Sequence, residues 1–177
     1  MMKTLLVAAA IAIPMAGVAT ASDVENRTDP EIEDMAFDHM SINVADFDGA
    51  MTWYQDKLGF EVDVSWRVEA LNGKQLAYLS LGDTVIELVA ADEGGRGLPV
   101  AATFQDHFAR TGYGHLCFSV EDVDATLARL EEKGVPVFVT AETYALDETP
   151  YERRVGFIQD PEGNVIEFAE SLRIRQQ

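Results

Sequence analysis

The order of elements along this chain is set by residues 114–124, which read GHLCFSVEDVD. Polar and apolar residues alternate through this stretch as in a strand, and the acidic residues after it are typical of a helix start. A similar sequence, DHMSINVADFD, occupies residues 38–48, and the histidines of the two segments are 76 positions apart. Further on, VIEL at residues 85–88 matches VIEF at residues 165–168 at an offset of 80. The sequence therefore contains an internal duplication, in which each copy has one histidine near its start and one glutamate near its end.

Each copy predicts a strand, a helix and three further strands. In the first copy, residues 37–90, the expected elements are a strand at 39–44, a helix from Asp46 or Asp48 to Leu58, and strands at 60–69, 75–81 and 84–90. In the second copy, residues 113–170, they are a strand at 113–120, a helix at 122–133, and strands at 135–140, 151–159 and 165–170. Asn72-Gly73 is typical of a two-residue hairpin. The fold class is therefore α+β, built from two tandem βαβββ modules.

Three segments lie between or beside the two copies. Residues 22–36 are polar and acidic, which predicts a flexible leader. Residues 91–112 form a linker, within which residues 101–110 predict a short helix. His107 in this helix has no partner at a ligand spacing, and we interpret it as an exposed polar residue without a chemical role. Residues 171–177 are expected to form a frayed tail.

Residues 1–21 have the pattern of a secretory signal peptide. A positive residue near the start is followed by an apolar run from residue 5 to 18 and by an A-x-A cleavage site at residues 19–21. The alternative is a membrane anchor, but the apolar run is shorter than the roughly 20 residues that a membrane span needs. We expect cleavage between Ala21 and Ser22 and a periplasmic or secreted mature protein.

Composition limits the classes of partner. The formal net charge is −18, which disfavours binding to nucleic acid and to anionic lipid. After signal cleavage we therefore expect neither a nucleic-acid nor a membrane partner, and a small-molecule substrate instead. Cys117 is the only cysteine, so no disulfide can form within the chain.

The duplicated polar side chains are expected on the open faces of the sheets. Strand alternation sets His39 and His115 apart from their apolar neighbours, which should contact the helices. Glu87 and Glu167 each lie in the middle of an apolar strand. A carboxylate in such a place is costly without a counter-charge, and here that cost is incurred twice at equivalent positions.

A metal ion would remove this cost. A pseudo-two-fold axis between the modules would bring two imidazoles and two carboxylates to one point, which suits Zn²⁺, Ni²⁺, Mn²⁺ or Fe²⁺. The sequence therefore predicts four metal ligands: His39, Glu87, His115 and Glu167. The alternative is that Arg153 or Arg154 neutralises Glu167 or Glu87 locally.

Several stretches resemble the vicinal oxygen chelate superfamily, the group of glyoxalases, bleomycin-resistance proteins and extradiol dioxygenases. These stretches are residues 38–60, 84–87, 112–115 and 157–167. The resemblance spans about residues 36–170, nearly all of the expected mature chain. It implies paired βαβββ modules that form a cupped sheet around a metal site, with ligands on the first and last strands of each module.

Within the superfamily, the His-Glu-His-Glu order is most similar to glyoxalase I, or lactoylglutathione lyase. This resemblance implies that His39, Glu87 and His115 hold the metal, and that Glu167 is both a ligand and the catalytic base. The implied reaction isomerises the thiol hemithioacetal of a 2-oxoaldehyde, with the metal on vicinal oxygens and a glutamate moving the proton. Asn43 departs from the family pattern, because glyoxalase I commonly has an arginine there that helps hold glutathione.

Asn43 and Cys117 are the residues that we expect beside the substrate. Cys117 lies two residues after His115 on the same predicted face, where its thiol would line the cavity. The competing interpretation of Cys117, which we prefer, is a small buried residue that fills the core. The face taken by Trp66, on the second strand, is not determined by the sequence.

Other functions remain open. An isomerase of the methylmalonyl-CoA epimerase kind usually has glutamine at the position of Glu87. An extradiol-type dioxygenase uses two histidines and one glutamate on iron, and a fourth protein ligand would crowd the positions for oxygen and substrate. A non-enzymatic, resistance-type binding protein lacks a complete set of ligands. The two modules of one chain suffice for one site, but relatives often pair modules across a dimer, so a homodimer is also possible.

Overall fold

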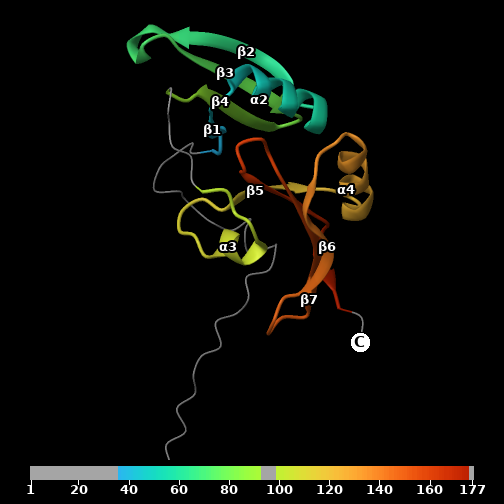
Figure 1. The fold of residues 1–177 in the computed structure, drawn as a ribbon. Helices are drawn as coiled ribbons and strands as arrows, with labels where there is room; N and C mark the ends of the chain where they lie inside the picture. The colour runs from blue at the N-terminus through green and yellow to red at the C-terminus, as the bar shows by residue number, and fades with distance from the viewer. Residues whose placement is uncertain (1–35, 93–98, 176–177) are drawn as a thin grey trace, which may run out of the picture. The chain divides into compact units, whose positions relative to one another are not determined.

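The computed structural model describes residues 36–92 and 99–175 (Figure 1). The predicted signal peptide at residues 1–21 lies outside these ranges, as does the predicted leader except for Ala36. The helices and strands of the described ranges all belong to the unit Asp38–Gln177. Within those ranges, the helices are too short or too polar to cross a membrane.

The first copy forms a four-stranded sheet accompanied by a helix (Figure 1). Its elements are β1 (Met40–Val44), α2 (Phe47–Trp53), the π-helical turn η1 (Tyr54–Leu58), β2 (Glu61–Val68), the 3₁₀ turn η2 (Glu69–Leu71), β3 (Lys74–Leu81) and β4 (Thr84–Ala90). The strand order is β1-β4-β3-β2, with β1 parallel to β4 and the other neighbours antiparallel. Asp46 caps the start of α2 by accepting a hydrogen bond from the backbone of Gly49, and Gly59, with a φ of 83°, ends the helical segment.

The loop between β2 and β3 is longer than a two-residue hairpin. Val68 pairs with Lys74, so residues 69–73 connect the two strands. Asn72 and Gly73 take the left-handed conformation that this signal requires, with φ of 57° and 73°. The 3₁₀ turn η2 precedes these two residues. The sequence therefore predicts the position of the connection correctly but underestimates the length of the loop.

The second copy repeats this topology after a linker helix. The linker contains α3 (Phe104–Phe108), and the copy contains β5 (His115–Ser119), α4 (Val123–Glu132), β6 (Val137–Ala145), β7 (Tyr151–Gln159) and β8 (Val165–Ala169). The strand order is β5-β8-β7-β6, with β5 parallel to β8. The predicted tail is partly ordered, because β9 (Arg173–Ile174) pairs with Tyr151 and Glu152 of β7. Two mixed sheets with the same strand order confirm the α+β fold predicted from the duplication.

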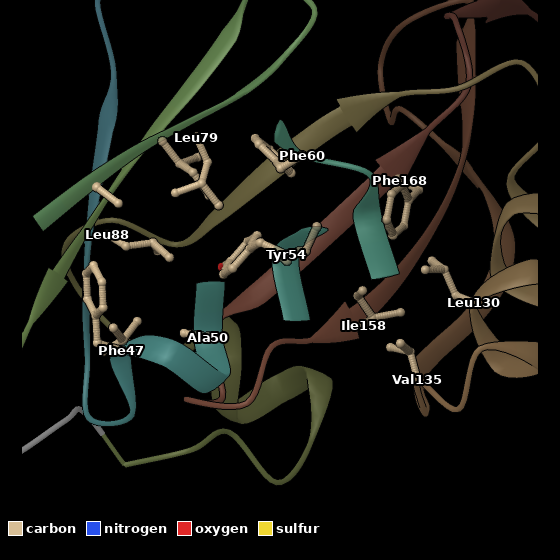
Figure 2. Packing of buried hydrophobic residues seen from close by; sticks show 14 of the residues in the cluster. Phe47, Ala50, Tyr54, Phe60, Leu79, Leu88, Leu130, Val135, Ile158 and Phe168 are labelled. Atoms are coloured by element: carbon tan, nitrogen blue, oxygen red, sulfur yellow. The ribbon is translucent and has the colours of Figure 1, made fainter. Parts of the chain in front are cut away.

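One apolar core joins the two copies (Figure 2). It contains the helix-facing side of each sheet, including the buried Ile86 of β4 and Ile166 of β8. Aromatic rings meet across the copies, with the centroid of Phe60 at 6.1 Å from that of Phe118. Because this side of each sheet is used for the core, the opposite side is left for other contacts.

A buried hydrogen bond also links the copies. The hydroxyl of Tyr54 donates to Oδ2 of Asp160 at 2.8 Å. Asp160 accepts further hydrogen bonds from the backbone of Glu162 and Asn164, within the tight turn before β8. Burial, together with the carboxylate of Asp160, raises the pKa of Tyr54, which therefore remains a neutral donor.

Two equivalent lysines form a reciprocal contact at the ends of the helices. Nζ of Lys57 donates to the carbonyl oxygen of Lys133 at 2.7 Å, and Nζ of Lys133 donates to that of Lys57 at 2.9 Å. The lysines occupy matching positions in the duplication. Each ammonium thus donates to a carbonyl oxygen at the C-terminal end of the helix in the other copy, where a positive charge is favourable.

We predict that Tyr54→Phe lowers the free energy of unfolding by about 2 kcal/mol, because it removes a buried hydrogen bond to a charged group. Urea unfolding followed by circular dichroism measures the change. Tyr113→Phe, at a residue that is 94% exposed, is the matched control and should leave stability unchanged. Equal stability of the two variants would show that the Tyr54 hydroxyl does not help to hold the copies together.

Candidate metal and substrate site

The two histidines and two glutamates lie on the open faces of their sheets, as alternation predicts. In the first sheet, Ser41 of β1 pairs with Glu87 of β4, and parallel partners share a face. Cys117 and Glu167 pair in the same way in the second sheet. The structure therefore brings the four side chains together as two pairs, one on each sheet.

The first pair is His39 and Glu87. Nε2 of His39 lies 3.7 Å from Oε2 of Glu87, which is beyond hydrogen-bond distance. Nδ1 of His39 lies 2.5 Å from Oδ1 of Asp38, and an ionised carboxylate can only accept. A neutral His39 therefore has its proton on Nδ1 and a free lone pair on Nε2, which is the form that ligates a metal.

Two aromatic side chains flank the first pair. Tyr78 of β3 pairs with Glu87 of β4, and its ring centroid lies 5.2 Å from that of His39. The ring centroid of Trp66 lies 4.9 Å from that of Tyr78, so Trp66 lies on the open face as well. Burial and the carboxylates of Glu87 and Asp38 raise the pKa of Tyr78, so its hydroxyl is neutral at neutral pH. Sequence reasoning missed Tyr78, because alternation shows its face but not the register between β3 and β4.

The second pair is His115 and Glu167. Nε2 of His115 lies 2.8 Å from Oε2 of Glu167, within hydrogen-bond distance. Burial by itself raises the pKa of Glu167, but hydrogen bonds from His115 and Cys117 and the nearby charge of Arg153 outweigh it. The pKa of Glu167 is therefore lowered, and its side chain is a carboxylate at neutral pH.

The two residues expected beside the substrate are both exposed. Asn43 lies on the open face of β1, where it pairs with Val89 of β4. Cys117 is exposed and contacts Glu167, so its interpretation as a buried filler is wrong. Partial desolvation and the carboxylate of Glu167 raise the pKa of Cys117 to about 11.

His107 is buried, so the prediction that it is an exposed residue is wrong. Only 6% of the residue is exposed, and its Nε2 lies 3.0 Å from Nδ1 of His115. Burial, with repulsion from positive charge on His115 and Arg110, lowers the pKa of His107. No spacing in the sequence signals this contact, because it depends on how α3 folds against β5.

The two pairs do not form one cluster within a single chain. Among the described residues, no three of these side chains place their ligand atoms within 4.8 Å of one another. The donor types fit a divalent transition ion, but two donors are fewer than the three or four protein ligands of zinc sites. Of the arginines offered as local counter-charges, Arg154 pairs with Asp124. Arg153 donates to the carbonyl of Glu170 and forms no ion pair with Glu167, although its charge helps to lower the pKa of Glu167.

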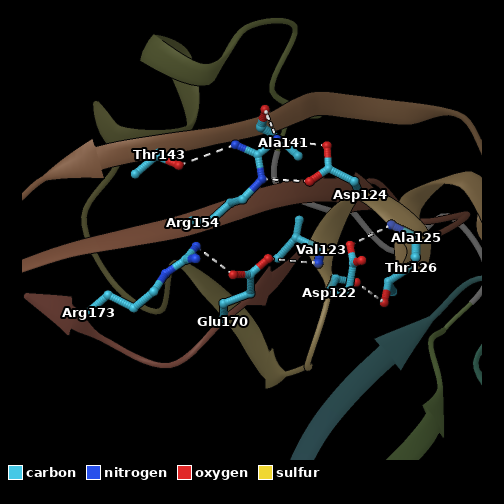
Figure 3. Close-up of polar contacts among 10 residues, drawn as sticks. All are labelled: Asp122, Val123, Asp124, Ala125, Thr126, Ala141, Thr143, Arg154, Glu170 and Arg173. Atoms are coloured by element: carbon cyan, nitrogen blue, oxygen red, sulfur yellow. Dashed lines mark hydrogen bonds and ion pairs between the residues drawn. The ribbon is translucent and has the colours of Figure 1, made fainter. Parts of the chain in front are cut away.

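A different group of carboxylates gathers at the start of α4 (Figure 3). Ligand atoms of Asp122, Asp124 and Glu170 lie within 4.8 Å of one another. Arg154 forms two hydrogen bonds with Asp124, while Glu170 accepts from Arg173 and from the backbone of α4. Asp122 caps the helix through the backbone of its first turn. These contacts explain the cluster as support for a helix start.

A cavity of about 460 Å³ adjoins the second pair. It is bordered by β1, by the start of β8 and by four side chains: His107, Arg110, Tyr113 and His115. Its size is within the range of small-molecule sites. Of the second pair, His115 lines the cavity and Glu167 does not.

Fold and side chains together define a class of protein: paired βαβββ modules with a histidine and a glutamate on the open face of each sheet. Residues 36–168 match the family model of the Glyoxalase/Bleomycin resistance protein/Dioxygenase superfamily. The chain belongs to this superfamily, which confirms the resemblance seen in the sequence.

Known relatives agree with this assignment. The chain is 34% identical over 104 residues to an ethylmalonyl-CoA/methylmalonyl-CoA epimerase of Cereibacter sphaeroides, over 59% of this chain and 75% of the relative. It is 28% identical over 169 residues to a lactoylglutathione lyase of Pseudomonas putida, over 84% of this chain and 92% of the relative. Among solved structures, a glyoxalase family protein from Enterococcus faecalis is similar with a TM-score of 0.58 and 25% identity, over 76% of this chain and 97% of that protein.

The raised pKa of Cys117 gives a prediction for chelator-treated protein. Because Cys117 is the only cysteine, alkylation by iodoacetamide followed by mass spectrometry reports its thiolate. The rate of alkylation should rise with pH around a midpoint of about 11. Glu167→Gln removes a negative charge that raises this pKa, so the midpoint should fall and alkylation at pH 8 should become several times faster. Glu121→Gln, at an exposed residue outside the pair, should leave the midpoint in place, and an equal midpoint in all three proteins would contradict the contact.

Proposed function

We propose that the chain is an exported, metal-dependent lyase or isomerase of the glyoxalase kind. Its substrate in this proposal is the adduct of a 2-oxoaldehyde with a thiol, or a similar small molecule with vicinal oxygens. The observation that carries the proposal is the repeated pair, His39 with Glu87 and His115 with Glu167, on the open faces of both sheets. A partly buried carboxylate needs positive charge beside it, and a divalent ion of the kind that this superfamily typically binds would supply it.

Two copies of the chain form each site in this proposal. One chain has two donors on each sheet. A full set of four ligands therefore requires that the first pair of one copy lie against the second pair of another copy. The open face around the first pair also has the exposed Val64 and the ring of Trp66 beside Tyr78. Exposed apolar and aromatic surface around a polar pair is typical of protein interfaces. In a two-fold dimer, one rotation brings the first pair of each copy to the second pair of the other copy, so two equivalent sites form.

The residues that would hold the ion are His39 and Glu87 of one copy and His115 and Glu167 of the other. The donor set of two imidazoles and two carboxylates is compatible with Zn²⁺, Ni²⁺, Mn²⁺ or Fe²⁺. When bound, such an ion polarises two vicinal oxygens and stabilises the negative charge that develops on them. Tyr78 lies beside Glu87 on the neighbouring strand, and its hydroxyl is neutral because its pKa is raised.

Glu167 moves the proton in the proposed reaction. Its lowered pKa keeps it ionised at neutral pH, so it accepts a proton from a carbon next to a carbonyl and returns it to the neighbouring carbon. Cys117 lies beside Glu167 on the exposed face, and Asn43 lies on the open face of β1. These positions support the proposal that both side chains contact the substrate.

Epimerisation of a 2-substituted malonyl thioester is the second candidate. The observation that favours it is the 34% identity to the epimerase of Cereibacter sphaeroides. Both reactions remove a proton from a carbon next to a carbonyl, so the same ion and the same base would serve. Glu87, where such epimerases usually have glutamine, favours the lyase.

A complementation experiment tests the shared site. One variant combines His39→Ala with Glu87→Gln, and the other combines His115→Ala with Glu167→Gln. Each alone should bind no zinc, because every site lacks one complete pair. Co-refolded in equal amounts, they should recover about a quarter of the wild-type zinc content, since half of the dimers are mixed and each mixed dimer has one intact site.

Metal analysis by mass spectrometry and size-exclusion chromatography provide the readouts. A mixture that binds no zinc while wild-type protein does would refute sharing between copies. The control is a variant of each chain with Gln105→Ala, an exposed residue of α3, which should not change the recovery.

A substrate panel tests the reaction. Wild-type protein with added metal should convert methylglyoxal in the presence of at least one of several thiols, and Glu167→Gln should lower kcat by about a hundredfold or more. Exchange of the C2 proton of methylmalonyl-CoA in heavy water would instead assign the epimerase. Oxygen uptake with catechols would assign a dioxygenase, and absence of bound metal together with no turnover of any of these compounds would assign a binding protein. Full activity of Glu167→Gln would refute the assigned base.

A further inference from the structure

A second cavity is lined by residues of both copies and lies away from the candidate site. Its volume is about 340 Å³, near the lower end of the range of small-molecule sites. Its walls come from η1 and β3 of the first copy and from β5, α4 and β8 of the second. It shares no lining residue with the cavity beside His115, and none of the four candidate ligands borders it. Any ligand of this cavity is therefore separate from the proposed metal chemistry.

The walls of this cavity are largely apolar and adjoin the core. The rings of Phe118 and Phe168 are stacked, with their centroids 6.2 Å apart, and Phe168 belongs to the buried core. The apolar side chains of the lining are Leu58, Leu81, Phe118, Val120, Leu130 and Phe168. A hydrocarbon group in this cavity would be removed from water on several sides, which favours its binding.

Three cationic side chains also line the cavity, and no carboxylate does. They are Lys57, Arg129 and Lys133. The whole chain has 31 acidic and 13 basic residues, so a wall with cations alone runs against its overall charge. Among the residues that the structure describes, the lysines and arginines that form ion pairs are three others. The charges of these three side chains are thus not neutralised by a carboxylate partner in the described part of the chain.

The contacts of these cations hold them in place without using all of their donors. Nζ of Lys57 donates to the carbonyl oxygen of Lys133. Nζ of Lys133 donates to the carbonyl oxygens of Asp56 and Lys57. Nη2 of Arg129 donates to the hydroxyl of Thr126 at 3.2 Å. An ammonium has three N–H groups and a guanidinium has five, so each side chain keeps at least one donor for a ligand. Side chains that are already held lose less freedom when a ligand binds.

The sum of the local charges favours an anion. The two lysines lie at the C-terminal ends of two helices, and each end has a partial charge of about −0.5. These two partial charges balance about one of the three positive side chains. The mouth of the cavity therefore retains an excess of about two positive charges beside an apolar wall.

We propose that this cavity binds a small amphipathic anion, which has an apolar tail and a carboxylate or phosphate head. The tail lies against Phe118 and Phe168. The head accepts hydrogen bonds from Lys57, Lys133 and Arg129. Because both copies contribute to the lining, the ligand contacts the two modules at once and stabilises their association. The inference does not rest on the proposed function, because the cavity contains none of the candidate metal ligands.

A matched series of eight-carbon compounds tests the inference in the full-length chain by isothermal titration calorimetry, below the concentrations at which these compounds form micelles. Octanoate or octyl phosphate should bind at least tenfold more tightly than octanol and octylamine, and the tighter of the two anions identifies the head group. Affinity should rise about three- to fourfold for each methylene added between hexanoate and octanoate. Equal binding of octanol, or no binding of either anion, would overturn the inference.

Variants of Arg129 test the cationic wall, because this exposed residue lies on the surface of α4. Arg129→Gln should weaken binding of the anion about two- to fivefold, as expected for an exposed charge pair, and Arg129→Glu should weaken it further. Arg129→Lys should retain most of the affinity. Arg67→Gln removes the same charge from an exposed residue outside both cavities and should bind as wild type does. Wild-type affinity in Arg129→Glu would overturn the inference.

The location of the ligand provides an independent readout. In proton–nitrogen spectra, the anion should shift the backbone amide signals of Leu81, Ser119 and Thr126, which line this cavity. Shifts confined to Ser41 and Tyr113, which line the other cavity, would overturn the inference. The affinity should be equal with Zn²⁺ and with a chelator, and an affinity that requires Zn²⁺ would place the anion at the metal site instead. A protein that binds the anion but no zinc would refute the proposed function and leave this inference in place.

Discussion

The shared apolar core is the constraint on which the rest of the structure depends. Both sheets bury their helix-facing sides in one cluster, in which Tyr54 of the first copy and Ile166 of the second are almost fully inaccessible. Burial of each large side chain contributes about 1.5–3 kcal/mol, more than an exposed polar contact does. The core therefore decides which side of each sheet faces inward, and the histidine and glutamate of each copy remain on the other side. The apolar core and the candidate site thus lie on opposite faces of the same strands.

The linker makes the two open faces unequal. On the second sheet, Phe157 and Val165 form a small buried cluster with Phe104 of α3. The first sheet has no such cover among the described residues, and Val64 on it is exposed. A dimer that joins unlike faces would place the uncovered face of one copy against the helix-bearing face of the other. This difference explains why a duplicated sequence gives histidines with different partners.

The sequence predicts what depends on local periodicity and on the duplication. The element order of each copy, the helix caps at Asp46 and Asp122 and the sheet face on which the four candidate ligands lie follow from alternation and from the matching offsets. The predicted meeting of the four at one point is not found within one chain. What it does not predict depends on tertiary packing: the burial of His107, the exposure of Cys117 and the pairing of β9. A histidine in a linker has no repeated counterpart, so the signal that points to the four candidate ligands is absent for it.

The carboxylates connect ion binding with association of the chain. Glu87 has an imidazole and a tyrosine hydroxyl beside it, and Glu167 has an imidazole and a thiol. Within the described ranges, neither forms an ion pair with lysine or arginine, and the whole chain has a formal charge of −18. Bringing Glu87 of one copy to Glu167 of another is therefore unfavourable unless a cation lies between them. In the proposed dimer the ion is then part of the interface as well as of the reaction, and ion binding and pairing of copies stabilise each other by mass action.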